Sequence, residues 1–178
     1  MFIQSGRLCI RLFRHNDHTE VQGYASNPDV MFYIPGGALD EAGVRSFLEE
    51  NIVSAPRNYA VVQAETGAVI GHIVFHPYFG QHTYEIGWVF DPRYCNQGYA
   101  TEAARAVMDY GFCRLHLHRI IATCQPDNIP SWRVMEKLGM RREGFFKQCI
   151  PRGDGGWWDE YYYAVLKEEW DKGSLFDR

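Results

Sequence analysis

Hydrophobic and polar positions change their period several times along the chain, and the clearest change lies between residues 85 and 115. Residues 85–90 are aromatic or β-branched with an alternating pattern, which predicts a β-strand. Asp91 and Pro92 end that strand, because proline cannot donate to a strand ladder and restricts the residue before it. From Thr101 onward a helix is predicted, because apolar residues recur at helical spacing at Ala100, Ala104, Val107, Met108, Gly111, Phe112 and Leu115.

The flanking segments predict a sheet with several helices. Alternating or β-branched runs predict strands over 8–12, 59–64, 69–75, 119–124, 145–150 and 161–166. Helical patterns begin after Asp17, Asp40 and Asn128, and Glu20 stands where it completes a capping box with Asp17. The order is an antiparallel meander, then a strand that a right-handed crossover places parallel to 85–90. We therefore expect one mixed α/β domain over 1–178.

Composition narrows the class of protein. The chain has 178 residues, of which 46% are hydrophobic and 22% charged, as in a soluble globular protein. A net charge of −4 gives no basic surface for nucleic acid or for an anionic membrane, so we expect neither as a partner. The scattered cysteines contain no Cys-x-x-Cys pair, and no signal peptide or spanning apolar run is present. These features predict a cytoplasmic protein with reduced cysteines.

The loop over 95–100 is a candidate anion site. A strand, a tight loop with Gly98 and a helix N-terminus together direct unpaired backbone N–H groups toward one point, which suits a phosphate or a pyrophosphate. The alternative is an ordinary turn between a strand and a helix. The sequence has neither the glycine-lysine pattern of a P-loop nor the Gly-x-Gly-x-x-Gly pattern of a dinucleotide fold.

A second motif follows the strand over 119–124. Asn128 stands at the start of a short helix, Pro130 suits its first turn, and Gly139 terminates it. Ser131 and Met135 share one face of this helix, near its N-terminal end. From spacing alone, Asn128 is better explained as a helix cap and Ser131 as a first-turn hydroxyl than as functional residues.

Both motifs together resemble a known family. The first reads Cys95-Asn96-Gln97-Gly98-Tyr99-Ala100-Thr101-Glu102, and the second reads Asn128-Ile129-Pro130-Ser131 followed by Glu136-Lys137-Leu138-Gly139-Met140. They resemble the GNAT superfamily of acetyl-CoA-dependent N-acetyltransferases, and within it the RimJ/RimL group, named for acetylation of ribosomal-protein N-termini. Similar segments at 7–11, 27–31 and 158–170 extend the resemblance over nearly the whole chain. It implies an α/β fold in which an antiparallel meander leads into a splayed parallel strand pair, with helices on both faces.

The resemblance also implies where acetyl-CoA binds. The backbone of Trp88, Val89 and Phe90 pairs with the pantetheine arm, Asn128 bonds it, and Ser131 and Met135 lie near the thioester sulfur. The pyrophosphate is held by backbone N–H groups of the loop that carries the family pattern, at Cys95, Asn96, Gln97, Gly98, Tyr99, Ala100 and Thr101. Cys95 departs from the family's usual Gln or Arg, which weakens a site made mainly of backbone dipoles only modestly.

The catalytic residues are less clearly marked. Many relatives carry a tyrosine as general acid where this chain has Met135, which cannot donate a proton, so Ser131 is the candidate acid; alternatively, the thiolate leaves unaided. Glu85 is the candidate general base, and its alternative is a solvent-facing or helix-paired carboxylate. A backbone N–H of Val89 or its neighbour is the expected donor to the oxyanion.

The acceptor is an amine, either a protein N-terminus or a small molecule, and residues 31–40 and 153–158 are the expected contacts. A non-catalytic acyl-CoA sensor is the rival function, because Met135 replaces the usual acid. His72 with His76, and His116 with His118, suggest a metal site, but no third ligand has suitable spacing, so we expect strand-surface histidines and no metal. The aromatic run over 157–163 either walls the acceptor pocket, packs the sheet or forms a homodimer contact.

Overall fold

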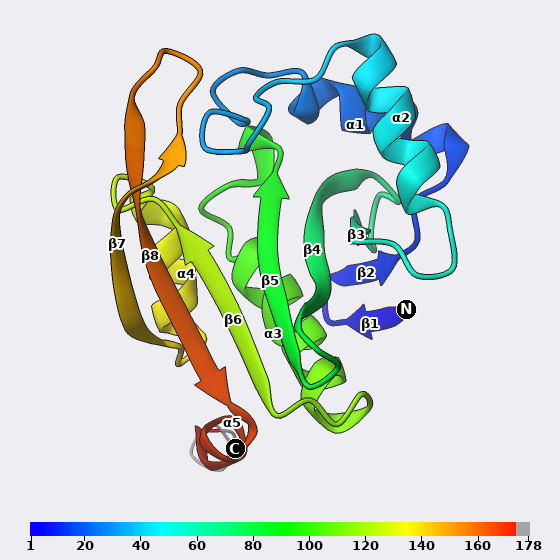
Figure 1. The fold of residues 1–178 in the computed structure, drawn as a ribbon. Helices are drawn as coiled ribbons and strands as arrows, with labels where there is room; N and C mark the ends of the chain where they lie inside the picture. Colours follow the sequence, from blue (N-terminus) through cyan, green and yellow to red (C-terminus); the bar gives the residue numbers. More distant parts are fainter. Residues whose placement is uncertain (174–178) are drawn as a thin grey trace. The chain divides into compact units, whose positions relative to one another are not determined.

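The computed structural model describes residues 1–173, which form one eight-stranded sheet and its helices (Figure 1). The strands are β1 Ile3–Ser5, β2 Leu8–Arg11, β3 Asn58–Gln63, β4 Val69–Phe79, β5 Thr83–Phe90, β6 Arg119–Cys124, β7 Arg141–Pro151 and β8 Trp157–Leu166. The α-helices are α1 His18–Ala25, α2 Glu41–Asn51, α3 Tyr99–Cys113, α4 Ile129–Lys137 and α5 Lys167–Gly173. Two 3-10 turns, η1 His15–Asp17 and η2 Pro92–Tyr94, precede α1 and follow β5.

The sheet confirms the predicted mixed topology. Its strand order is β1-β2-β3-β4-β5-β6-β8-β7. The pairs β1–β2, β2–β3, β3–β4, β6–β8 and β7–β8 are antiparallel. β5 and β6 are parallel, with Thr83 opposite Arg119 and Glu85 opposite Ile121. The crossover between them contains α3, as the sequence pattern predicts.

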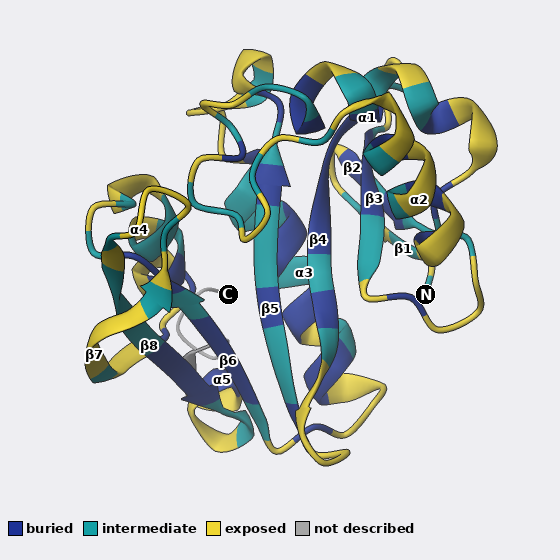
Figure 2. Cartoon of the chain, turned by 45° about the horizontal axis from the view of Figure 1, so that its top comes forward, coloured by how far each residue is buried: buried dark blue, intermediate teal, exposed yellow. Residues whose placement is uncertain are grey.

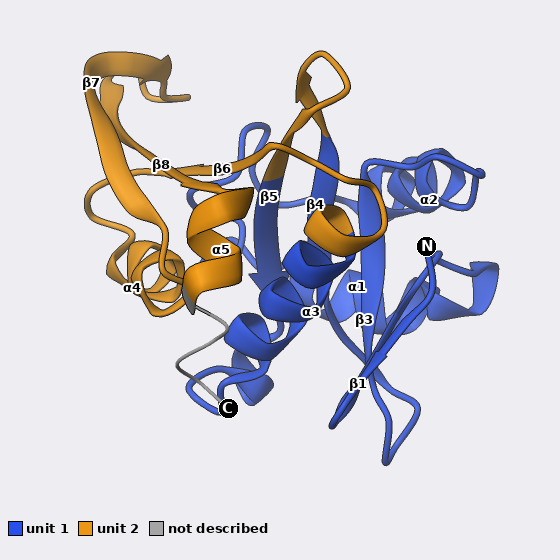
Figure 3. Cartoon of the chain, turned by 90° about the horizontal axis from the view of Figure 1, so that it is seen from below, with its two compact units in different colours: residues 1–76, 86–110 blue, residues 77–85, 111–178 orange. Residues whose placement is uncertain are grey.

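Two compact units divide the chain, and they are described separately (Figure 3). Unit 1 comprises Met1–His76 and Ile86–Tyr110, and unit 2 comprises Pro77–Glu85 and the chain from Gly111 onward. Both β4 and β5 contribute residues to each unit. Within residues 1–173, no helix has the length and apolar character needed to cross a bilayer.

Buried residues make up much of β3 and of the part of β4 that belongs to unit 1 (Figure 2). One cluster joins α1 and α2 to one face, with members Phe13, Val21, Tyr24, Ala25, Met31, Val44, Leu48, Ala60, Val62, Val69 and Val89. Val61 and Ile86 are also buried, and because each is an odd number of residues from a cluster member on its strand they point to the opposite face. The helix α3 runs behind β4 and β5 in Figure 1 and buries Ala103, Ala104, Val107 and Met108.

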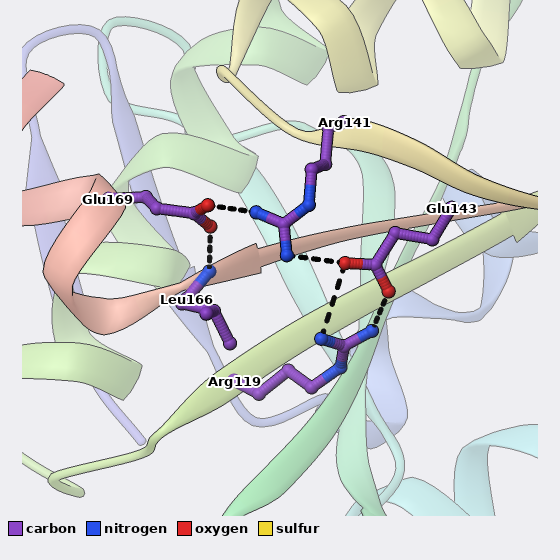
Figure 4. Close-up of polar contacts among 5 residues, drawn as sticks. All are labelled: Arg119, Arg141, Glu143, Leu166 and Glu169. Carbon is purple, nitrogen blue, oxygen red and sulfur yellow. Dashed lines mark hydrogen bonds and ion pairs between the residues drawn. The ribbon is translucent and has the colours of Figure 1, made fainter.

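In unit 2, β8 lies between β6 and the exposed edge strand β7. Phe112 at the end of α3 packs on Trp170 of α5, with ring centroids 5.7 Å apart. An ion-pair network lies nearby, in which Glu143 of β7 bonds both Arg119 and Arg141, and Arg141 bonds Glu169 of α5 (Figure 4). Glu169 also accepts the backbone N–H of Leu166 at 2.8 Å, so the network joins three strands to the C-terminal helix.

Several local predictions were wrong. Asp17 does not cap α1 with its side chain in the described structure; its carboxylate instead binds Arg11 with both oxygens, at 2.7 and 2.8 Å. A paired, charge-assisted bond outcompetes a single cap. β4 continues through Pro77 to Phe79, although the strand was predicted only over 69–75. Trp157 and Trp158 belong to β8, so the loop before it spans only 152–156.

His72 is not on the strand surface but is buried beneath α1 and α2. Its Nδ1 lies 2.9 Å from the hydroxyl of Tyr24, and Phe13 and Phe47 pack against its ring. Burial lowers the pKa of His72 to about 4. The histidine is therefore neutral at physiological pH and serves the core of unit 1.

Candidate functional site

The loop between β5 and α3 has the geometry of an anion cradle. Asp91 accepts the backbone N–H of Arg93 at 2.9 Å and starts η2, and α3 begins at Tyr99. Between them, Asn96 has φ +60° and Gly98 has φ +82°, so two left-handed residues flank Gln97. Alternating backbone handedness turns successive N–H groups to one side, and the first N–H groups of α3 have no acceptor within the helix. Residues 95–98 are exposed, so these groups are accessible to a ligand.

Arg7 braces this cradle from the turn between β1 and β2. Its guanidinium donates to Glu102 of α3 at 2.8 Å and to the carbonyl oxygen of Gln97 at 3.1 Å. The same group lies over the ring of Tyr99, 4.3 Å from the centroid. The hydroxyl of Tyr99 accepts a bond from Gln63 at 2.9 Å. Sequence reasoning assigned Arg7 no role, because its partners lie some ninety residues away and leave no local signal.

The second half of β5 is fixed by a close approach of β4. A carbon at the Cβ position of Gly71 would lie 2.4 Å from the carbonyl oxygen of Val89 and 2.9 Å from Cα of Phe90. Ile70 accepts the backbone N–H of Asp91 at 3.0 Å, immediately after the strand. β4 therefore closes one edge of this segment, and only the opposite edge is left for an added pantetheine strand.

In unit 2, Glu85 is the half-buried acid that sequence analysis nominated as base. It stands opposite Ile121, which in turn stands opposite Ala164 of β8. Burial raises the pKa of the Tyr78 phenol, and the nearby Tyr162, Glu85 and Glu160 raise it further. Glu85 is thus close enough to Tyr78 to act electrostatically on its hydroxyl.

The start of α4 also lies in unit 2. Asn128 is the N-cap residue, as the alternative reading expects, although within the described chain its side chain makes no cap hydrogen bond. The Ser131 side chain is hydrogen-bonded to that of Cys124 at the end of β6. Met135, one turn further, is 1% exposed and cannot supply a proton. Of the three residues, only Asn128 and Ser131 present polar groups.

The thiols are poorly suited to nucleophilic catalysis. Burial raises the pKa of Cys124 to about 12, although its bond to Ser131 lowers that value in part. Burial and Asp91 raise the pKa of Cys95, and burial and Glu160 raise that of Cys149. All five cysteines are free. In the part of the chain that the structure describes, no three His, Cys, Asp or Glu side chains gather as metal ligands do.

The aromatic run over 157–163 has several environments. Tyr163 is buried and its hydroxyl bonds Glu136 of α4 at 3.3 Å, so it packs the sheet. Tyr162 lies on Tyr78, and Trp157 is 54% exposed. Of these three, Tyr162 is the one whose ring lies beside that of Tyr78.

Comparison with known proteins gives consistent matches. Residues 7–141 match the family model described as an acetyltransferase (GNAT) domain. The chain is 56% identical over 171 residues to the uncharacterized N-acetyltransferase YnaD of Bacillus subtilis strain 168, covering 96% of this chain and 100% of that protein. It is 57% identical to an acetyltransferase (GNAT family) from Bacillus anthracis whose crystal structure superposes with a TM-score of 0.91, covering 94% of this chain and 99% of that one.

A shorter match concerns an enzyme with a named acceptor. The ribosomal protein uS5-alanine N-acetyltransferase of Escherichia coli K12 is 29% identical over 92 residues, which are 52% of this chain and 47% of that protein.

Proposed function

The chain belongs to the GNAT family of acetyltransferases, with similarity to the RimJ/RimL group, and from this we propose that it transfers the acetyl group of acetyl-CoA directly to a primary amine. The single observation that supports the cosubstrate best is the loop with left-handed Asn96 and Gly98 at the N-terminus of α3. The family model spans residues of both units, so we further propose that the whole chain acts as one catalytic domain.

The pyrophosphate fits the cradle made by backbone N–H groups from Cys95 to Thr101, with positive charge from Arg7 beside it. We assign the pantetheine arm to the free edge of Trp88, Val89 and Phe90, because β4 closes the other edge at Gly71. Asn128 then binds the arm with the amide that the helix leaves unused. Buried Met135 contributes only apolar support behind it.

Acetyl-CoA supplies an activated thioester, and the protein supplies the proton transfers. Glu85 takes a proton from the acceptor ammonium, because only a neutral amine has a lone pair for attack. As the new C–N bond forms and the C–S bond breaks, a backbone N–H of Val89 or its neighbour stabilises the oxyanion, and the Ser131 hydroxyl gives a proton to the leaving sulfur. The second proton, which the nitrogen loses as it becomes an amide, restores the Ser131 hydroxyl. The raised pKa of Cys124 argues against an acetyl-cysteine intermediate and favours direct transfer.

The acceptor follows from the relatives only as a class. The uS5-alanine enzyme supports a protein N-terminus, and a small amine is the other candidate. We place the reaction in the cytoplasm, in keeping with five free cysteines. No observation favours a non-catalytic sensor.

Two measurements test this function. Calorimetric titration with CoA should give one site per chain, and mixing acetyl-CoA with amines and N-terminal peptides should release free thiol. Glu85→Gln and Ser131→Ala should each lower turnover by about tenfold to a hundredfold without changing the Kd for CoA. If the protein binds CoA but releases thiol with no acceptor, the non-catalytic sensor becomes the better explanation. If it does not bind CoA, the proposal is refuted entirely.

A further inference from the structure

One face of unit 2 carries both Glu85 and a second carboxylate, Glu160. Glu85, Ile121 and Ala164 stand in one row across β5, β6 and β8. Paired residues share a face of the sheet, and every second residue of a strand returns to it. Tyr162 and Glu160, two and four residues before Ala164, therefore lie on the same face as Glu85.

Two tyrosines cover this face. The rings of Tyr78 and Tyr162 lie with their centroids 6.4 Å apart, although β5 and β6 separate their strands in the sheet. Both rings must therefore reach across the intervening strands. Glu85 and Glu160 both act electrostatically on the Tyr78 hydroxyl, so both carboxylates lie in its surroundings.

The positive charge beside Tyr162 is already paired with another carboxylate. Arg119 is hydrogen-bonded to Tyr162, but its guanidinium is ion-paired with Glu143. Glu160 is half-buried, and the Sγ atom of Cys149, a weak donor, lies 4.0 Å from its carboxylate. A carboxylate near aromatic rings attracts a cation, because the ring faces carry negative potential.

Ser131 and its partner Cys124 are on the opposite side of the sheet. Cys124 stands opposite Tyr161, which alternates with Tyr162 and Glu160, and Ser131 comes from α4 on that side. The leaving sulfur is assigned to the α4 side, so the acceptor approaches from the other face. The reacting nitrogen needs one base, Glu85, and is neutral when it attacks. A second carboxylate on this face is then suited to a different positive charge.

Building on the proposed function, we propose that Glu160, with Tyr78 and Tyr162, binds a positive charge of the acceptor that is separate from the reacting nitrogen. The acceptor class is a primary amine with a second cationic group. A linear diamine or polyamine meets this description, and so does a peptide whose N-terminal residue is followed by lysine or arginine.

The test compares matched acceptors by the initial rate of thiol release. 1,4-Diaminobutane is paired with 4-amino-1-butanol, and Ala-Lys-amide with Ala-Gln-amide, so the two pairs distinguish a small amine from a peptide. The wild-type protein should prefer the dicationic member of at least one pair by about tenfold in kcat/KM. Glu160→Gln should remove that preference through KM, with little change for the monocationic member.

Asp159→Asn is the matched control, because it removes the same charge from the neighbouring residue while its amide oxygen can still accept the Gln148 N–H. It should keep the wild-type preference. Equal rates within both pairs for the wild type, or a preference that survives in Glu160→Gln, would overturn the inference. If thiol release occurs while the preference is absent, only this inference fails; if no acceptor releases thiol, the proposed function fails with it.

Discussion

Replacement of Gly71 by alanine tests the packing that leaves β5 one free edge. The added methyl carbon would lie 2.4 Å from the carbonyl oxygen of Val89, and 2.9 Å from both Cα and the ring carbon Cγ of Phe90. A carbon and an oxygen do not normally approach closer than about 3.2 Å, so the overlap is close to 1 Å. Two of the three atoms belong to backbone, so rotation of a side chain cannot relieve the contact.

We expect Gly71→Ala to lower the free energy of unfolding by about 3 kcal/mol, the upper part of the range for overpacked sites. In a chain of this size that corresponds to a fall in Tm of about 6–12 °C. Urea unfolding, monitored by tryptophan fluorescence, measures this free energy. The m-value should stay unchanged if the substitution affects only the packing of the native state. Because Val89 and Phe90 must move, the affinity for CoA should also fall by about tenfold or more.

Gly87→Ala is the matched control on β5. Its methyl group would lie 3.5 Å from Cβ and Cγ2 of Val74, an ordinary contact, so its unfolding free energy should stay within about 1 kcal/mol of wild type. If Gly71→Ala were as stable as Gly87→Ala and bound CoA normally, the close approach of β4 to β5, and with it the argument for the free edge, would be refuted.

Three further variants test other features. Arg7→Gln should weaken CoA binding about threefold to tenfold by calorimetry, because it removes the brace and a charge beside the cradle, and unchanged affinity at low salt would contradict that role. Glu143→Gln should cost about 1 kcal/mol at pH 7 in urea unfolding; Arg119 and Arg141 lower the pKa of Glu143, so this difference should vanish as pH falls below the usual glutamate range, and a pH-independent difference would refute the network. His72→Gln should make stability less dependent on pH in acid. In the wild type the unfolded histidine takes up a proton below about pH 6.5, whereas the folded histidine stays neutral down to about pH 4. The free energy of unfolding of the wild type should therefore fall by about 3 kcal/mol between these two pH values. An identical acid limb in the variant would exclude His72 as its source.

The sequence predicted those parts of the site that depend on local period. The change from strand to helix around Gly98 is visible because alternation, proline and helical spacing succeed one another there, and the structure confirms each element. The parallel pairing of β5 and β6 was predicted from chain connectivity alone.

Long-range contacts could not be predicted in this way. Asp17 has the local pattern of a helix cap, but its carboxylate instead accepts hydrogen bonds from Arg11, which lies outside that pattern. His72 sits on an alternating strand whose two faces are both covered, so alternation did not reveal its burial. The brace from Arg7 and the bridge between Tyr78 and Tyr162 join residues far apart in sequence, and neither leaves a periodic signal.

The position of Glu85 on β5 constrains how it acts as base. Four residues separate it from Val89, and an extended strand rises about 3.3 Å per residue, so the two Cα atoms are about 13 Å apart along the strand. A glutamate side chain reaches about 5 Å from its Cα. If the oxyanion forms at the Val89 amide, the attacking nitrogen lies beyond direct reach of Glu85, and the proton must cross a bridging water. The face that holds Glu85 therefore needs room for both a water molecule and the acceptor. Side chains of a strand alternate between the two faces, so the register of β5 determines that both must lie on this face.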